Sequence, residues 1–248
     1  MKFDKMKDNF SHQSANYANF RPQYPKAIFD EIKKHLNSTK NAWDCATGNG
    51  QVASELSKFF DLVKATDISE NQLKQALKIS NINYSIQPAE NVDFPDHFFD
   101  LVTVAQAIHW FDFDRFYAEV KRTLKPDGII AILGYSLFRS NPETNKIIDH
   151  FYYDVIGSSW DEERKYLDDA YASIPFPFQE IATPEINFKE EWEFERLIGY
   201  LKTWSAVKHF SDKHGFNPVD DIFEELRESF GGKNSIEFPI IFKIGKLF

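Results

Sequence analysis

The fold of this chain is decided by the stretch Ala42-Trp43-Asp44-Cys45-Ala46-Thr47-Gly48-Asn49-Gly50-Gln51. Its beginning predicts a buried strand at 42–45, and a helix is expected at 51–60. The two glycines between them can adopt positive φ and leave no Cβ between the backbone and a ligand. Such a unit places free N–H groups at a helix N-terminus, beyond the end of a strand. An ordinary strand-to-helix turn looks the same, so the rest of the chain must decide.

The residues around this stretch alternate between apolar runs and amphipathic segments. We expect helices at 26–36, 51–60, 69–78 and 112–124, and strands at 42–45, 62–66, 83–87, 99–105 and 129–133. Lys125-Pro126-Asp127-Gly128 predicts a turn before the last of these strands. The alternation is typical of a parallel, doubly wound sheet with right-handed crossovers.

The pattern changes after residue 136. The stretch 137–180 is aromatic and acidic, and we expect it to form an inserted helical cover over the active site. Beyond it we expect a strand at 185–189, a helix at 194–207, another ending near 230, and a last strand at 236–244, antiparallel to the strand at 185–189. The predicted fold is α/β, a three-layer sandwich with a doubly wound, mostly parallel seven-stranded sheet whose last strand is antiparallel.

Composition narrows the classes of function. The net charge is −9, divided into −1 for residues 1–150 and −8 for residues 151–248, so a basic surface for nucleic acid is not expected. Cys45 is the single cysteine, which excludes an internal disulfide and a multi-cysteine metal site, and no metal is expected. Because we find no signal peptide and no membrane span, we expect a cytoplasmic protein that does not bind membranes.

Functional residues follow the predicted strands where each one ends. They are Asp44 with Gly48 and Gly50, then Asp67, then Ala89-Glu90, then Gln106 and His109-Trp110. Ligands of parallel sheets bind beyond the carboxyl ends of the strands. An acid after the second strand can accept hydrogen bonds from both hydroxyls of a ribose. These residues together predict a nucleoside ligand.

Two functions compatible with such a ligand can be considered first. Gly48-Asn49-Gly50-Gln51-Val52-Ala53 fits the dinucleotide pattern G-x-G-x-x-A, which favours an NAD(P)-dependent oxidoreductase. Asp44 counts against it, because an acid at the strand end suits a ligand with a positive amino group. The other is a protein that binds a nucleoside cofactor without turnover.

The run Asp44 to Gln51, with Asp67, Ala89-Glu90, Gln106 to Phe111 and Leu124 to Gly128, resembles class I S-adenosylmethionine-dependent methyltransferases. Within them the chain is similar to the small-molecule branch that includes trans-aconitate methyltransferases. The resemblance is dense over residues 17–134. Ala46 stands where the family usually has its first glycine, and we expect binding to survive with a slightly altered turn.

The resemblance implies a role for each matching residue. Asp44 would face the amino group of the methionine part, with Gln106 nearby. Ala46, Gly48 and Gly50 would form the turn that lets the backbone approach the cofactor. Asp67 would hold the ribose, Ile68 the adenine face, and Ala89 and Glu90 would lie beside the adenine. Tyr17 and Arg21 would close over the cofactor, Arg21 meeting its carboxylate.

We therefore expect one domain over 1–248, with an N-terminal arm (1–25), a cofactor-binding core (26–136), the cover (137–180) and C-terminal strands and helices (181–248). The expected reaction moves a methyl group from S-adenosyl-L-methionine to a small molecule and leaves S-adenosyl-L-homocysteine. A carboxylate acceptor needs no base, since it is ionised at pH 7; for a hydroxyl or amine, His109 is the candidate base. The candidate substrate contacts are His109, Trp110, Arg139 and Trp204, and we expect a monomer or weak homodimer.

Overall fold

The computed structural model describes residues 20–248, so the predicted contact of Tyr17 lies outside the described residues. A sheet of seven strands forms its centre, in the order β3-β2-β1-β4-β5-β9-β6. Strand β9 runs antiparallel to both of its neighbours, and the pairs from β3 to β5 are parallel. The predicted α/β fold with a mostly parallel sheet and an antiparallel last strand is confirmed. The strands are β1 (Asn41–Cys45), β2 (Leu62–Asp67), β3 (Ile82–Ile86), β4 (Phe99–Ala105), β5 (Leu124–Tyr135), β6 (Gln179–Ile181) and β9 (Ile240–Lys246).

Helices cover both faces of this sheet, because each buries one apolar stripe against it. On one face, Ile28 and Ile32 of one helix pack beside Val52 and Leu56 of another. Phe116 belongs to a third helix, which packs on the other face. These helices, with the short one that follows β2, are α2 (Lys26–Lys34), α3 (Gln51–Leu56), α4 (Glu70–Lys74) and α5 (Phe113–Thr123). The helices at 51–60 and 69–78 are thus shorter than predicted.

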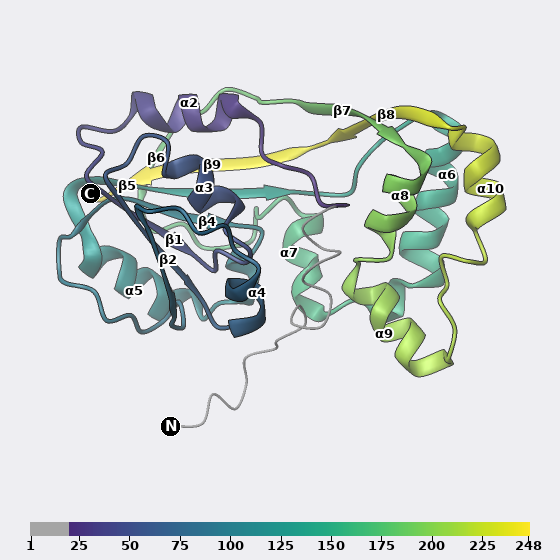
Figure 1. Cartoon of the computed structure of the whole chain (residues 1–248), viewed down its shortest axis with the longest axis horizontal. Helices are drawn as coiled ribbons and strands as arrows, with labels where there is room; N and C mark the ends of the chain where they lie inside the picture. Colours follow the sequence, from purple (N-terminus) through teal and green to yellow (C-terminus); the bar gives the residue numbers. More distant parts are fainter. Residues whose placement is uncertain (1–19) are drawn as a thin grey trace.

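A second apolar core lies beside the sheet. Figure 1 shows the sheet with α2 to α5 on the left and further helices on the right, with the strand pair β7–β8 leading to them. Trp192 and Phe238, both buried in this second core, come from those two strands. The elements are α6 (Pro142–His150), α8 (Phe194–Leu201), α9 (Ser205–His214), α10 (Phe223–Phe230), β7 (Phe188–Glu193) and β8 (Lys233–Phe238).

The predicted cover at 137–180 is divided between the two cores. Helix α6 and the π-helix η2 (Phe151–Val155) belong to the second core. The short helix α7 (Lys165–Asp168), which follows η4 (Glu162–Arg164), and the residues up to Phe178 pack on the α5 face of the sheet. Strand β6 also comes from this stretch and was not predicted. Only the middle of the predicted cover therefore lies near the strand ends.

Three other predicted elements are wrong in detail. The strand at 236–244 is two strands separated at Pro239: β8 pairs with β7 as expected, whereas β9 enters the main sheet. The helix at 194–207 is interrupted before Ser205 and forms α8 and α9. The expected turn at 125–128 lies inside β5 as an irregularity, where the pairing moves from Phe99–Leu124 to Leu101–Ile129.

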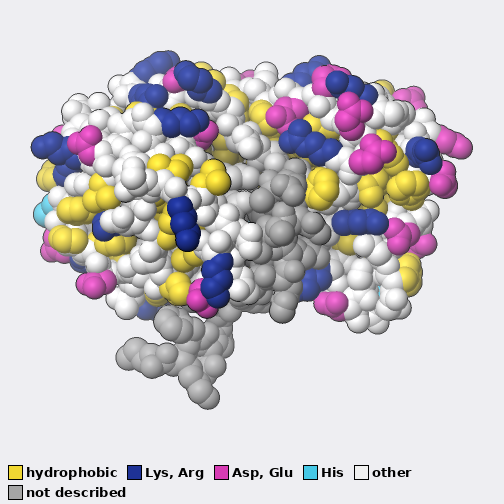
Figure 2. Space-filling view, in the orientation of Figure 1, with side chains coloured by type: hydrophobic (Ala, Val, Ile, Leu, Met, Phe, Trp, Pro, Cys, Tyr) yellow, Lys and Arg dark blue, Asp and Glu magenta, His cyan; other side chains and the backbone are white. Residues whose placement is uncertain are grey.

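The surface carries charges of both signs. Figure 2 shows acidic and basic side chains interspersed over the described part of one face. Among residues 20–248, no helix is both long enough and apolar enough to span a membrane.

Candidate functional site

The turn after β1 has positive φ at alternate residues: +53° at Ala46, +57° at Gly48 and +83° at Gly50. A Cβ at Gly48 would meet no neighbouring atom and would enter the cavity that this residue lines. At Gly50 the positive φ would strain any residue with a Cβ, and a Cβ would also displace the hydroxyl group of Tyr84. The glycine at position 50 does not line the main cavity, unlike our expectation of direct contact with the cofactor.

A cavity opens beyond the carboxyl ends of the strands, as the strand exits predict. The predicted residues Arg21, Asp44, Ala46, Gly48, Asp67, Ile68, Ala89, Glu90, Gln106 and Trp110 line it. The other residues of its wall include Thr47, Gln72, Gln87, Tyr135 and Glu163. The topology thus brings residues from the carboxyl ends of five strands, β1 to β5, to one site.

Asp44 is a buried carboxylate in the floor of this cavity. Its Oδ2 accepts hydrogen bonds from the Thr47 hydroxyl (2.5 Å) and the Ala53 N–H (3.0 Å), and its Oδ1 accepts one from the Thr103 hydroxyl (2.7 Å). Burial raises the pKa of Asp44 to about 6, although these three hydrogen bonds oppose the rise. A cation entering the cavity would stabilise the ionised form.

Asp67, at the end of β2, links the glycine turn to the next helix. Its Oδ2 accepts a hydrogen bond from the Gly48 N–H and its Oδ1 one from the Ser69 N–H, both at 2.8 Å. These bonds fix the plane of the carboxylate. Each carboxylate oxygen has two acceptor positions, so the fixed pair can also receive two neighbouring hydroxyl groups.

Glu90 contributes a buried acceptor to the same cavity. Its Oε1 accepts a hydrogen bond from the Asp112 N–H at 3.1 Å. Its Oε2 is buried and has no hydrogen-bond partner among residues 20–248. Because a buried polar atom without a partner costs free energy, this oxygen fits a ligand that brings an N–H or O–H donor.

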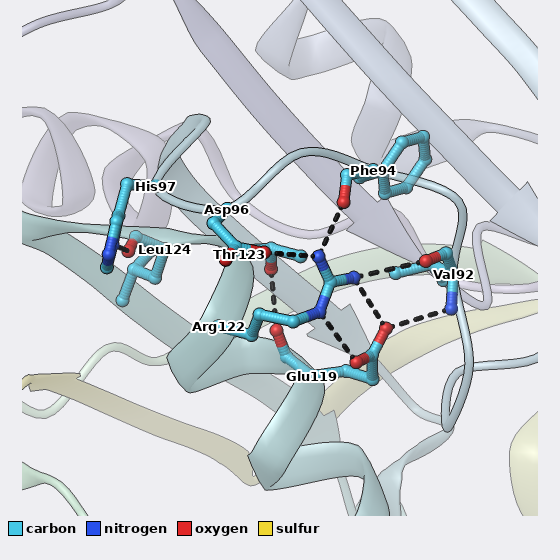
Figure 3. A network of polar contacts seen from close by, with 8 residues as sticks. All are labelled: Val92, Phe94, Asp96, His97, Glu119, Arg122, Thr123 and Leu124. Carbon is cyan, nitrogen blue, oxygen red and sulfur yellow. Dashed lines mark hydrogen bonds and ion pairs between the residues drawn. The ribbon is translucent and has the colours of Figure 1, made fainter.

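Arg122 of α5 holds the loop that follows Glu90 (Figure 3). Its guanidinium group donates to the carbonyl oxygens of Val92 (3.1 Å) and Phe94 (2.6 Å) and to Asp96 (2.8 Å). It also donates to both oxygens of Glu119 at 2.9 Å, and the Glu119 Oε2 accepts the Val92 N–H. The fixed fork of donors makes arginine suited to such a cluster. The cluster orders the loop behind the cavity wall.

Arg21 and Gln106 lie where the main cavity meets a second, smaller one. The Arg21 guanidinium donates to the Thr203 Oγ1 (3.1 Å) and the Tyr135 hydroxyl (3.2 Å). The Gln106 amide exchanges two hydrogen bonds with the backbone of Tyr135, at 2.9 and 3.0 Å. Both side chains are therefore fixed at the junction.

The second cavity contains three of the four predicted substrate contacts. His109 and Trp204 line it, and Trp110 lines both cavities. Its wall also holds Trp160, Asp161, Arg164, Leu167 and Ser205, from the middle of the cover and the start of α9. The fourth predicted contact is misplaced: Arg139 lines neither cavity and pairs with Asp149 at 2.6 Å.

His109 is neutral at physiological pH. Burial and the positive charge of Arg164 lower the pKa of His109 to about 3. Its Nδ1 is 3.0 Å from the Tyr171 hydroxyl. An imidazole with so low a pKa is a weak base, so its expected role as a general base is not supported by its surroundings.

Some residues of the site were not predicted from the sequence. Thr103 could have been noticed, because it is the polar residue of an apolar run at 101–105. Arg164 and Tyr171 carried no comparable signal, since their stretch has no regular spacing. Within the described part of the chain, no cluster of three or more His, Cys, Asp or Glu side chains could hold a metal ion.

Known proteins share this architecture and sequence. The pattern of a family described as "Methyltransferase domain" matches residues 43–132. A Dictyostelium discoideum protein named as a methyltransferase is 31% identical over 252 residues, which cover 98% of this chain and 96% of the relative. A ubiquinone/menaquinone biosynthesis C-methyltransferase of Geobacter sulfurreducens is 34% identical over 185 residues, 66% of this chain and 71% of that relative. A solved structure from Anaeromyxobacter dehalogenans, described as a type II methyltransferase, has a TM-score of 0.84 at 35% identity and covers 92% of this chain and 98% of its own.

These similarities decide between the methyltransferase, the oxidoreductase and the protein without turnover, which the glycine turn leaves open. The D. discoideum protein and the A. dehalogenans structure match nearly the whole chain, including the second core, and both are described as methyltransferases. The dinucleotide pattern at 48–53 therefore does not indicate an oxidoreductase. The chain belongs to the class I S-adenosylmethionine-dependent methyltransferases, and S-adenosylmethionine is its cofactor.

Proposed function

We propose that this enzyme transfers the methyl group of S-adenosylmethionine to the carboxylate of a small molecule held in the second cavity. The observation that carries the proposal is the composition of that cavity's wall. Arg21, Arg164 and one acid, Asp161, line it together with His109, whose lowered pKa leaves it neutral. The two guanidinium groups outnumber the single carboxylate and favour an anionic ligand, and a carboxylate acceptor needs no base.

The cofactor positions that we infer use the fixed polar groups of the main cavity. The two oxygens of Asp67 receive the ribose hydroxyls, and the ionised Asp44 lies near the amino group of the methionine part. The buried Oε2 of Glu90, which has no partner in the described part of the chain, supports an adenine amino group beside Ala89. Gly48 lets the backbone approach the ligand. With the nucleoside end so placed, the sulfur would lie toward Gln106 and the second cavity.

The reaction requires no proton transfer by the protein. Bound S-adenosylmethionine supplies an electrophilic methyl group on a sulfonium. In the displacement, a carboxylate oxygen forms the new O–CH₃ bond, the C–S bond breaks and its electron pair stays on sulfur, giving a methyl ester and S-adenosylhomocysteine. The chain's own contribution is orientation and exclusion of water, and well-oriented pairs reach effective molarities on the order of 10⁵–10⁸ M.

Arg164 is well suited to orient an anion because its own position is fixed. Its Nε donates to the Tyr152 hydroxyl at 2.5 Å, and its guanidinium carbon lies 4.5 Å from the centre of the Trp160 ring. The side chain is therefore oriented before a ligand arrives, which lowers the entropy cost of binding. The flat aromatic walls at Trp160 and Trp204 favour a planar or apolar body attached to the carboxylate.

C-methylation is a second candidate, because one relative at 34% identity is named as a C-methyltransferase. A single assay separates the two. The enzyme is incubated with S-adenosylmethionine labelled in the methyl group and with fractionated carboxylic acids, and the product is treated with mild alkali. A methyl ester releases labelled methanol, whereas a C-methyl product keeps its label. Label that survives alkali in every product would contradict O-methylation of a carboxylate.

A further inference from the structure

We propose that Tyr171 is a positioning residue that holds His109 as its Nε2–H tautomer, so that the imidazole presents a hydrogen-bond donor to an anionic acceptor. The inference deepens the proposed function and rests on it for the identity of the group that receives the bond. It gives His109 a role other than that of a base, and it gives a role to a residue that lines neither cavity.

The proton of the Tyr171 hydroxyl determines the tautomer. The hydroxyl is buried, and its hydrogen-bond partner among residues 20–248 is the Nδ1 of His109, at 3.0 Å. Burial raises the pKa of Tyr171 above its ordinary value, so the phenol keeps its proton. A buried hydroxyl proton requires an acceptor. The Nδ1 can accept only when the imidazole proton is on Nε2.

The Nε2–H group is then the donor left for the cavity. His109 lines the second cavity, and its Nδ1 is already bonded to Tyr171. The ring also packs against two aromatic rings that are tilted to it, with Trp110 at 4.9 Å and Tyr171 at 5.9 Å between ring centres. Arg164, which lines the same cavity, disfavours a second proton on the imidazole. The ring therefore offers a neutral N–H donor in a fixed orientation.

The backbone that carries Tyr171 is strained. Ala170 and Tyr171 have φ of +55° and +61°, although residues with a Cβ seldom adopt this region. The ring of Tyr171 packs where Gly134 of β5 has no side chain, since a Cβ there would lie 2.9 Å from the ring. Lys243 donates to the Tyr171 carbonyl at 3.2 Å. Strained residues of this kind persist where the surroundings fix them, and they gather at functional sites.

The arrangement favours an anion over an amine at the acceptor position. The Nε2–H of His109 adds a third donor to the guanidinium groups of Arg21 and Arg164 around the second cavity. An amine acceptor would bring its own donors against these three. In the Nδ1–H tautomer the same ring would present a lone pair and would repel a carboxylate. Tyr171 thereby determines whether His109 attracts or repels a carboxylate in the second cavity.

Nitrogen NMR of the full-length protein labelled with ¹⁵N-histidine tests the proposal. The resonances of His109 are identified by their loss in His109→Gln, and coupling through the ring carbons shows which nitrogen is protonated. Sodium acetate is then titrated as the carboxylate probe with S-adenosylhomocysteine present. Tyr171→Phe removes the hydroxyl that bonds to Nδ1. Tyr117→Phe is the matched control, because its hydroxyl bonds to the Pro175 carbonyl at 2.6 Å in the same core.

We expect His109 in the wild type and in Tyr117→Phe to be the Nε2–H tautomer, with shifts that do not titrate above pH 5. Acetate should perturb its Nε2–H resonance. In Tyr171→Phe the tautomer preference should be lost and the affinity for acetate should fall about tenfold, with unchanged affinity for S-adenosylhomocysteine. An Nδ1–H tautomer in the wild type, an unaltered tautomer in Tyr171→Phe, or no response to acetate would each overturn the proposal.

These results are separable from the methyl transfer assay. The tautomer and the acetate response are measured without turnover, so they stand even if the acceptor is not a carboxylic acid. If alkali-labile transfer is found while the wild type shows the Nδ1–H tautomer, the inference about Tyr171 fails and the proposed function survives.

Discussion

Replacing Asp67 by asparagine should weaken the binding of S-adenosylhomocysteine about 10- to 100-fold. Both carboxylate oxygens of Asp67 accept backbone N–H groups at 2.8 Å, one from Gly48 and one from Ser69. An amide of the same shape has one oxygen and one NH₂ group, so in either orientation the NH₂ faces one of those N–H donors. The amide therefore loses one backbone hydrogen bond and the negative charge that strengthens the bonds to the ribose hydroxyls.

The magnitude follows from the loss of a charged acceptor. A hydrogen bond to a charged group contributes about 1.5–3 kcal/mol, and about 1.4 kcal/mol corresponds to a tenfold change in affinity. Isothermal titration calorimetry with S-adenosylhomocysteine at pH 8 measures the change. Asp61→Asn is the matched control, because this exposed residue lies at the opposite end of β2. A change below about threefold in a folded Asp67→Asn protein would refute the assignment of the ribose site.

Three further predictions concern the same cavity. Affinity for S-adenosylhomocysteine should fall about tenfold per pH unit below about pH 6, because the buried Asp44, with its pKa raised to about 6, must release a proton before it can pair with the ligand's amino group. Calorimetry from pH 5 to 8 should show this slope in the wild type and a flat profile in Asp44→Asn. Arg122→Met should lower the free energy of unfolding in urea by about 1–3 kcal/mol and weaken cofactor binding several-fold, because it frees the loop that follows Glu90. Unchanged affinity would show that the loop does not support the cavity. Ala46→Gly should leave cofactor affinity unchanged and raise stability by up to about 1 kcal/mol, because it relieves the φ of +53°; a loss of stability would contradict strain at this turn.

The sheet from β3 to β5 and the main cavity could be predicted because local pattern determines them. The run at 99–105 is apolar enough to be buried on both faces, and it forms the central strand β4. Asp67 could be placed because it ends an apolar run that predicts a strand. Strand ends in such a sheet converge on one edge, so residues far apart in sequence could be brought together without a structure.

The second core and the second cavity could not be predicted from the sequence, because tertiary contacts determine them. Strand β6 has three residues that are not buried, so no apolar period marks it. Pro239 divides one apolar run between two sheets, and which side joins which sheet depends on the partner strands. Arg139 was assigned to the substrate on charge alone, whereas the structure pairs it with Asp149. The role inferred for Tyr171 depends on a strained backbone, which no spacing in the sequence reveals.

The central claim is that the cofactor cavity leads into a cavity built for an anionic acceptor. A crystal structure of the full chain with S-adenosylhomocysteine and acetate tests it most directly. We predict both ribose hydroxyls within hydrogen-bond distance of Asp67, the sulfur beside Gln106, and acetate in the second cavity against Arg164 and the Nε2 of His109. A sulfur directed away from the second cavity, or acetate bound elsewhere while that cavity stays empty, would contradict the account.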